Sequence, residues 1–254
     1  MELFQWLFDL LSPAKWSTED EEALLNSRIY VRQAKSWDCG VACTTMVLRW
    51  CAQDPEVLSG EKALDTTPME APAETPLWTI DMYCFLRLRG LAASFSTAVP
   101  GINSAHTALA WYAPHIEADR QRVEEMFERA RTAGWAVGDP VPTEQLVRLL
   151  LAQGEGPLWD KQLCAIALVN NKHLHADPRL GGSGSVSSPG YAGHYVLVLG
   201  VSADGQDVRY LDPAKDAHTQ LCSVALFAQA RAAQGTDMDL LLVRRGGQPP
   251  APSA

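Results

Sequence analysis

Three features are absent from this 254-residue sequence, and each absence excludes a class of protein. No stretch reaches the roughly 18–20 consecutive apolar residues of a membrane-spanning helix, so we expect no transmembrane segment. Lys and Arg form no long run and the formal net charge is −9, which disfavours nucleic acid as a partner. The N-terminus carries Glu2 and Asp9 where a signal peptide would be basic. We therefore expect a cytoplasmic protein.

Motifs for cofactors and metals are also missing. The six cysteines would stay reduced in the cytosol, and Cys39 and Cys43 have no second cysteine pair at the spacing of a zinc site. The stretch GGSGSVSSPG lacks the Lys and the strand-to-helix context of a phosphate-binding loop. The sequence therefore predicts neither a cofactor nor a metal.

The composition is that of a folded protein, with 47% hydrophobic and 20% charged residues. The length favours one domain, which we place at residues 29–245. An amphipathic segment and linker over 1–28 precede it, and a tail over 246–254 has the composition of disordered chain. The apolar stripe of the N-terminal segment would dock on the domain, or else act as an interfacial anchor or offer a helix to a protein partner.

Hydrophobic periodicity predicts helices in the first half and strands in the second. Predicted helices open at Cys39 and Thr79 and cover 117–133, 143–153 and 223–232. Predicted strands cover 29–32, 93–97, 164–169, 194–201, 208–211 and 240–243. The stretches 55–76 and 180–190 are interpreted as loops. This segregation predicts an α+β domain in which the Cys39 helix packs on a C-terminal antiparallel sheet.

Candidate catalytic residues centre on Cys39, at the predicted N-terminus of a helix. Unpaired backbone N–H groups and the helix dipole favour a thiolate there. His194 begins an apolar strand directly after Gly193, which makes it the best placed of the six histidines to act as a base. Asp212 follows the strand 208–211. If that strand pairs with the strand of His194, the carboxylate can orient the imidazole.

Further residues fit a site for acyl transfer. Gln33 lies six residues before Cys39, where its amide and the Cys39 backbone N–H would share a developing oxyanion. In the substrate cleft, Trp37 would form a wall, and Gly40 and Gly193 would leave room for a substrate backbone. By position alone, a cysteine that begins a helix is more often a packed small hydrophobic residue.

Two sets of motifs resemble known families. The runs QAKSWDCGVACTTM, GHYVLVLG and LDP resemble the papain-like family of bacteriocin-processing C39 peptidases. The runs WDCGVACTTMVLRW, LWTIDM, RVEEMFERA, CAIALVN, GHYVLVLG and GTDMDLLLV are similar to the eukaryotic guanylyl cyclase domain-containing proteins. The second resemblance spans about residues 27–243.

The peptidase-like pattern implies a papain-like (C39 peptidase-like) cysteine protease fold and roles for four residues. Cys39 would be the nucleophile and His194 the general base and acid. Asp212 would orient the imidazole and Gln33 would donate to the oxyanion. The predicted function is a thiol hydrolase or acyl transferase that cleaves a peptide or amide bond through an acyl-enzyme on Cys39, with a peptide or protein as substrate.

Two alternatives stay open. The name of the second family implies a guanylyl cyclase that converts GTP to cyclic GMP with Mg²⁺ or Mn²⁺. Two-metal chemistry needs closely spaced carboxylates, and the tempting pairs are Asp237 with Asp239 and Asp204 with Asp207. We interpret both pairs as solvated surface acids in turns. The other alternative is a catalytically silent member of the fold that binds a partner.

Overall fold

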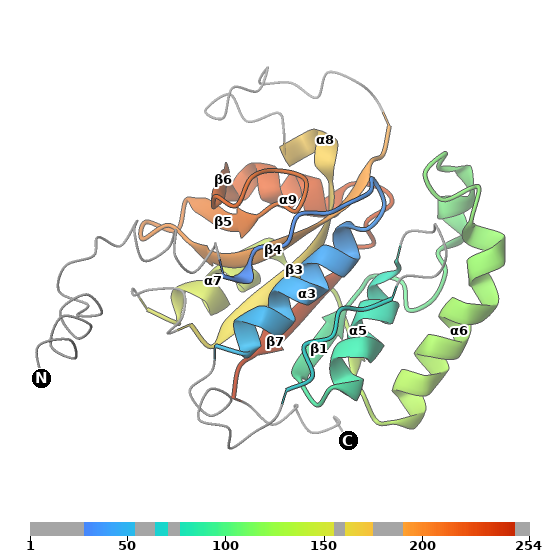
Figure 1. Ribbon diagram of the computed structural model, residues 1–254. Coiled ribbons are helices and arrows are strands. Elements are labelled where there is room, and N and C mark those ends of the chain that lie inside the picture. Colours follow the sequence, from blue (N-terminus) through green and yellow to red (C-terminus); the bar gives the residue numbers. More distant parts are fainter. Residues whose placement is uncertain (1–27, 54–63, 71–76, 155–160, 175–189, 247–254) are drawn as a thin grey trace, which may run out of the picture.

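The computed structural model is a mixed α+β fold with one sheet and helices packed against both of its faces (Figure 1). It describes residues 28–53, 64–70, 77–154, 161–174 and 190–246. The predicted N-terminal segment 1–28 and tail 246–254 lie almost entirely outside these residues. Most of the loop predicted at 55–76 and all but the last residue of 180–190 also lie outside them.

The sheet contains seven strands in the described part of the chain, in the order β2-β1-β7-β3-β4-β5-β6. The strands are β1 (Ala92–Ser96), β2 (Val137–Gly138), β3 (Leu163–Asn170), β4 (Gly193–Val201), β5 (Asp207–Leu211), β6 (Gln220–Ser223) and β7 (Leu240–Arg244). Neighbouring strands are antiparallel, except that β1 and β2 are parallel. Five predicted strands are thereby confirmed, as β1, β3, β4, β5 and β7.

The helices also follow the predicted pattern closely. They are α3 (Cys39–Cys51), α5 (Thr79–Leu88), α6 (Ile116–Thr132), α7 (Thr143–Leu151), α8 (Asn171–Leu174) and α9 (Val224–Ala232), with a 3₁₀ helix η2 (Ser104–Ala108). Thr79 is the first residue of α5, whose N-cap is Trp78. Within the described ranges, every helix is too short or too polar to traverse a bilayer.

Alternate residues of the central strand β3 face two different cores. Ile166 and Leu168 belong to a core shared with α3 and α5. Ala165 and Ala167 belong to a second core, shared with α7 and α9. A strand covered on both faces reads as a continuous apolar run, which is why β3 was recognisable in the sequence.

The predicted separation of a helical half from a β half is only partly right. Strand β1 comes from the first half of the chain and lies inside the sheet, between β2 and β7. Helix α9, from the C-terminal half, covers the face opposite α3 (Figure 1). The expected packing of the Cys39 helix on the antiparallel sheet is present, because α3 lies across β4 and β3.

The strand predicted over 29–32 is wrong. Ile29 is helical and fully buried, and the residues after it have no regular structure. The carbonyl of Tyr30 accepts a hydrogen bond from Arg49 of α3 (3.0 Å), and the N–H of Gln33 donates to the carbonyl of Pro213 (2.9 Å). These bonds fasten the segment to a helix and a turn, where it pairs with no strand of the sheet among the described residues.

Candidate active site

Cys39 is the first residue of α3, as predicted, and its side chain is buried. The preceding Asp38 accepts hydrogen bonds on its carboxylate from the N–H groups of Ala34 (3.1 Å) and Lys35 (3.1 Å). Its side chain therefore shapes the incoming loop, and no side chain caps α3 among the residues that the structure describes. The N–H groups of the first turn are left to stabilise negative charge near Cys39.

His194 and Asp212 meet at the end of two neighbouring strands. Strands β4 and β5 pair with Leu197 opposite Leu211, so the residues that carry the two side chains lie at the same end of this pair. Nε2 of His194 lies 2.7 Å from Oδ1 of Asp212, and both side chains are buried. The Cys39 side chain lies close enough to the imidazole to raise its pKa. The structure thus brings together the three residues that we predicted to act together.

The turn after β5 holds the Asp212 carboxylate in place. Oδ1 of Asp212 accepts a hydrogen bond from the N–H of Ala214 (2.8 Å), in addition to its contact with His194. The next carbonyl, that of Pro213, accepts from the N–H of Gln33 (2.9 Å) and from the hydroxyl of Tyr30 (3.3 Å). The carboxylate therefore points at the imidazole from a turn that is fastened on two sides.

The pKa of His194 reflects these contacts. Burial lowers the pKa of the imidazole, but the hydrogen bond to Asp212 and the contact with Cys39 outweigh burial and raise it from 6.5 to about 9. The imidazole is therefore protonated at neutral pH. The structure therefore places a positive charge beside the Cys39 side chain.

The backbone of Gln33 contacts the turn after Asp212, but its side-chain amide is not placed to donate to an oxyanion as we predicted. Nε2 donates to the carbonyl of Lys35 (2.8 Å), and Oε1 is buried without a hydrogen-bond partner in the described part of the chain. A half-turn of the amide about its last torsion would exchange the two atoms and bring Nε2 to the buried position. Gln33 is not among the residues that line the cavity at Cys39, so its donation to an oxyanion stays a prediction.

A cavity beside Cys39 is walled by aromatic side chains. Trp37 and Gly193, which we predicted to line the cleft, both line it. Sequence reasoning missed the other aromatic lining residues, which are Trp78, Trp111, Tyr112 and Tyr195. Three of these four come from the N-cap of α5 and the loop after η2, which are far from Cys39 in sequence, so local spacing gave no signal for them.

The prediction that Gly40 leaves room for a substrate is wrong. A Cβ atom on Gly40 would lie 3.0 Å from Sδ of Met82, 3.3 Å from Cδ2 of Tyr195 and 3.4 Å from Cβ of Leu77. Gly40 is buried in the protein interior, and it does not line the cavity at Cys39. The missing side chain instead allows α3 to approach α5 and β4 closely.

The one carboxylate that lines the Cys39 cavity, Asp119, is already engaged. Oδ2 of Asp119 accepts a hydrogen bond from Nε1 of Trp78 (2.9 Å), and Oδ1 pairs with the Arg122 guanidinium (2.7 Å). Arg122 also pairs with Asp81 of α5. The ion pair balances the charge of the carboxylate, so the wall around Cys39 is largely apolar and aromatic.

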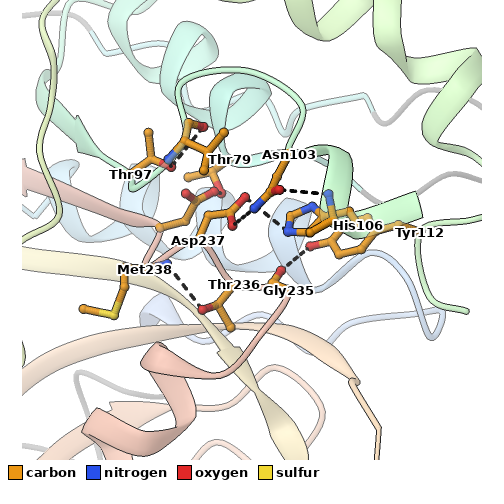
Figure 2. A network of polar contacts seen from close by, with 12 residues as sticks. Thr79, Thr97, Asn103, His106, Tyr112, Gly235, Thr236, Asp237 and Met238 are labelled. Atoms are coloured by element: carbon orange, nitrogen blue, oxygen red, sulfur yellow. Dashed lines mark hydrogen bonds and ion pairs between the residues drawn. The ribbon is translucent and has the colours of Figure 1, made fainter. Parts of the chain in front are cut away.

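The interpretation of Asp237 and Asp239 as solvated surface acids is wrong. Both are largely buried. Figure 2 shows Asp237 in a polar network with Asn103 and His106. Nδ2 of Asn103 donates to Oδ1 of Asp237 (2.7 Å), and the Thr79 hydroxyl donates to Oδ2 of Asp239. Burial raises the pKa of Asp239 to about 7. A turn-like sequence did not reveal that the rest of the fold covers this loop.

The sequence is similar to known proteins over the region that contains this site. The sequence profile of the family described as "Guanylylate cyclase" matches residues 29–243, a range that contains Cys39, His194 and Asp212. A protein of Arabidopsis thaliana named "Guanylyl cyclase 1" is 29% identical over 219 residues, which cover 84% of this chain and 74% of that protein. The matched region spans all the helices and strands given above except Arg244, the last residue of β7, and excludes both terminal segments, 1–28 and 246–254.

Proposed function

We propose that the chain, which belongs to the guanylylate cyclase family, acts as a thiol hydrolase or acyl transferase on a peptide or amide bond. The observation that supports the proposal is the contact series from Cys39 through His194 to Asp212 at an uncapped helix start. A papain-like, C39 peptidase-like relationship of the fold is part of the proposal. It rests on the same three residues and on Gln33.

In the first step, the Cys39 thiolate attacks the carbonyl carbon of the substrate and a C–S bond forms. The negative charge moves to the carbonyl oxygen, which the backbone N–H of Cys39 stabilises, together with Gln33 after its amide rotates. The His194 imidazolium gives its proton to the leaving nitrogen as the C–N bond breaks. The products are a free amine and a thioester on Cys39.

In the second step, water or an amine attacks the thioester, and His194, now neutral, accepts the proton of the attacking group. The new C–O or C–N bond forms, the C–S bond breaks, and the thiolate and imidazolium are restored. Asp212 keeps the ring oriented through both steps, because its carboxylate holds Nε2 and leaves Nδ1 for the thiol and the substrate.

A thiol-labelling experiment tests the proposed nucleophile. We expect iodoacetamide at pH 7 to alkylate Cys39 at least about tenfold faster than Cys51, because the thiolate is the reactive form. Cys51 is an internal control, since it ends the same helix and is similarly buried, with 3% exposure against 5% for Cys39. His194→Ala should abolish the difference, whereas His218→Ala, at an exposed position, should preserve it. Peptide mass spectrometry gives both rates.

An activated ester tests the acyl-enzyme itself. Incubation with p-nitrophenyl acetate should release one equivalent of p-nitrophenol in a burst and add an acetyl group to Cys39. The Cys39→Ala variant should show neither. Equal labelling of Cys39 and Cys51, with no burst, would contradict the hydrolase and favour a catalytically silent fold that binds a partner.

A guanylyl cyclase is the second candidate, and the observation in its favour is that both the family and the Arabidopsis protein are named for this activity. The divalent metal that this activity implies has no matching donor set within the described ranges, where no three His, Cys, Asp or Glu side chains gather to hold one ion. We therefore derive no step through a metal. Cyclic GMP formed from GTP with Mg²⁺ or Mn²⁺, and retained in Cys39→Ala, would establish this activity in place of the hydrolase.

A further inference from the structure

A second polar site lies outside the proposed catalytic residues. It consists of Asp237, Asp239, His106 and Thr79, which we call the Asp239 cluster. The loop before β7 supplies both acids, and η2 and the start of α5 supply the other two residues. In Figure 2, Asp237 and His106 point toward one another across the centre of the network.

Asp239 has one carboxylate oxygen without a partner. Oδ2 accepts from the Thr79 hydroxyl, but Oδ1 has no hydrogen-bond partner among the described residues, although Asp239 is only 9% exposed. The Thr97 hydroxyl, which donates to the carbonyl of Val99 (3.4 Å), also lies close enough to the Asp239 carboxylate to lower its pKa. A buried polar atom without a partner costs free energy, so a ligand that satisfies Oδ1 would bind favourably.

His106 repeats this feature on the other side of the cluster. The side chain is 2% exposed, and Nε2 lies 3.2 Å from Oδ2 of Asp237. The two atoms are not aligned for a hydrogen bond, and both ring nitrogens lack one in the part of the chain that the structure describes. The His106 ring is held instead by stacking on Tyr112, with ring centroids 4.4 Å apart.

All four residues of the Asp239 cluster line one cavity of about 20 Å³. A space of roughly 10–15 Å³ holds one water-sized particle, so the cavity has room for about one such particle. The loop that supplies the acids takes a costly conformation to reach the cavity, since Asp237 and Met238 have φ of 48° and 57°.

In the described residues, neither carboxylate forms an ion pair with a Lys or Arg side chain. Arg231, the buried cation nearby, bonds the carbonyls of Val141 and Met238 and the hydroxyl of Thr143.

We propose that the Asp239 cluster binds a single water-sized monovalent cation, such as sodium, potassium or ammonium, between Asp237 and Asp239. Neither acid has a Lys or Arg partner among the described residues, and burial raises the pKa of Asp239 to about 7, so a cation that binds here would stabilise the ionised carboxylate. No three His, Cys, Asp or Glu side chains converge on one ion among the described residues, and a divalent ion demands more oxygen ligands than two carboxylates supply. The site shares the walls Leu77, Trp78, Tyr112, Leu168 and Tyr195 with the Cys39 cavity.

Thermal unfolding of the full chain at constant ionic strength tests the proposal. NaCl, KCl or NH₄Cl replaces choline chloride, whose cation is too large for the cavity. We expect at least one small cation to raise the unfolding midpoint saturably, by about 3–6 °C at ten times its dissociation constant. Asp239→Asn should lose this dependence. Asp204→Asn, at an exposed acid, should retain it.

A second measurement on the unaltered protein keeps the test decisive if Asp239→Asn does not fold. The ²³Na NMR line should broaden in the presence of protein and narrow again when potassium or ammonium displaces bound sodium. The same midpoint in every salt, with no displaceable ²³Na broadening, would show that the cavity holds water only and overturn the proposal. Stabilisation by millimolar MgCl₂ alone would overturn the choice of a monovalent ion. Neither readout depends on Cys39, so the result is independent of the proposed hydrolase.

Discussion

The buried imidazole of His194 couples the stability of the fold to pH. Its pKa is raised from 6.5 to about 9, since the hydrogen bond to Asp212 and the contact with Cys39 outweigh burial. A group with a raised pKa in the folded state stabilises the fold below its unfolded pKa and loses that contribution as pH rises through the folded pKa. We expect His194 to contribute on the order of 3 kcal/mol at pH 6 and to lose most of this by pH 9.5.

Urea unfolding at several pH values measures this contribution. The difference in free energy of unfolding between the wild type and His194→Gln should shrink steadily from pH 6.5 to about 9. The exposed His218 provides the control, because the difference between wild type and His218→Gln should stay near zero throughout. A His194→Gln difference that is constant with pH, or grows, would mean that the imidazole is not held protonated by Asp212 and Cys39.

Single residues also show where sequence reasoning succeeded and where it failed. Cys39, His194 and Asp212 were identifiable because each stands at the end of an element with a strong apolar pattern, so their meeting followed from strand pairing. Asp237 and Asp239 were misread, because their burial depends on η2 and α5, which contact them only in the folded chain. Contacts between segments so far apart cannot be predicted from the local sequence.

The close approach of α3 to its neighbours depends on Gly40. A Cβ at this position would lie 3.0 Å from Sδ of Met82 on α5 and 3.3 Å from Cδ2 of Tyr195 on β4. We expect Gly40→Ala to lower the free energy of unfolding by about 1–3 kcal/mol, because overpacking shifts α3 away from its neighbours. The same shift should slow alkylation of Cys39 at the helix start.

Gly200→Ala is the matched control for this substitution. Gly200 lies on β4, and a Cβ there would meet nothing within 4 Å. Denaturant unfolding of both variants should therefore show a loss for Gly40→Ala and a change within about 0.5 kcal/mol for Gly200→Ala. Equal stability of the two variants would show that α3 has space to spare at its N-terminus.

Elements differ in how far their own sequence specifies them. Strands β3 and β4 are buried almost throughout, so their continuous apolar runs predict them directly. Strands β2 and β6 were missed because they have two and four residues and are defined by pairing with β1 and β5. The false strand at 29–32 has the opposite cause, since its apolar residues pack against a helix and a turn without a strand partner.

At the scale of the whole molecule, the proposed catalytic residues lie at the end of the part of the sheet that is buried on both faces. Strand β4 lies between β3 and β5, is buried on both faces and begins with the two residues Gly193 and His194. A site on such a strand is held rigidly, which suits a cysteine and a histidine that must stay within proton-transfer distance. The cavity walls come instead from α5 and from the loop after η2, which lie outside the sheet.

Hydrogen exchange followed by mass spectrometry or NMR tests this distribution of stability. Amides of β3 and β4 should exchange through global unfolding, and those of the edge strand β6 through local opening, at least about 100-fold faster. Leu221 of β6 is 41% exposed, whereas Val196 and Leu197 of β4 are fully buried. Low concentrations of guanidinium should accelerate exchange in β4 steeply and in β6 weakly, because global unfolding exposes far more surface than local opening. Equal protection of both strands would mean that the sheet opens as one unit, and His194 would then be no more rigidly placed than the edge.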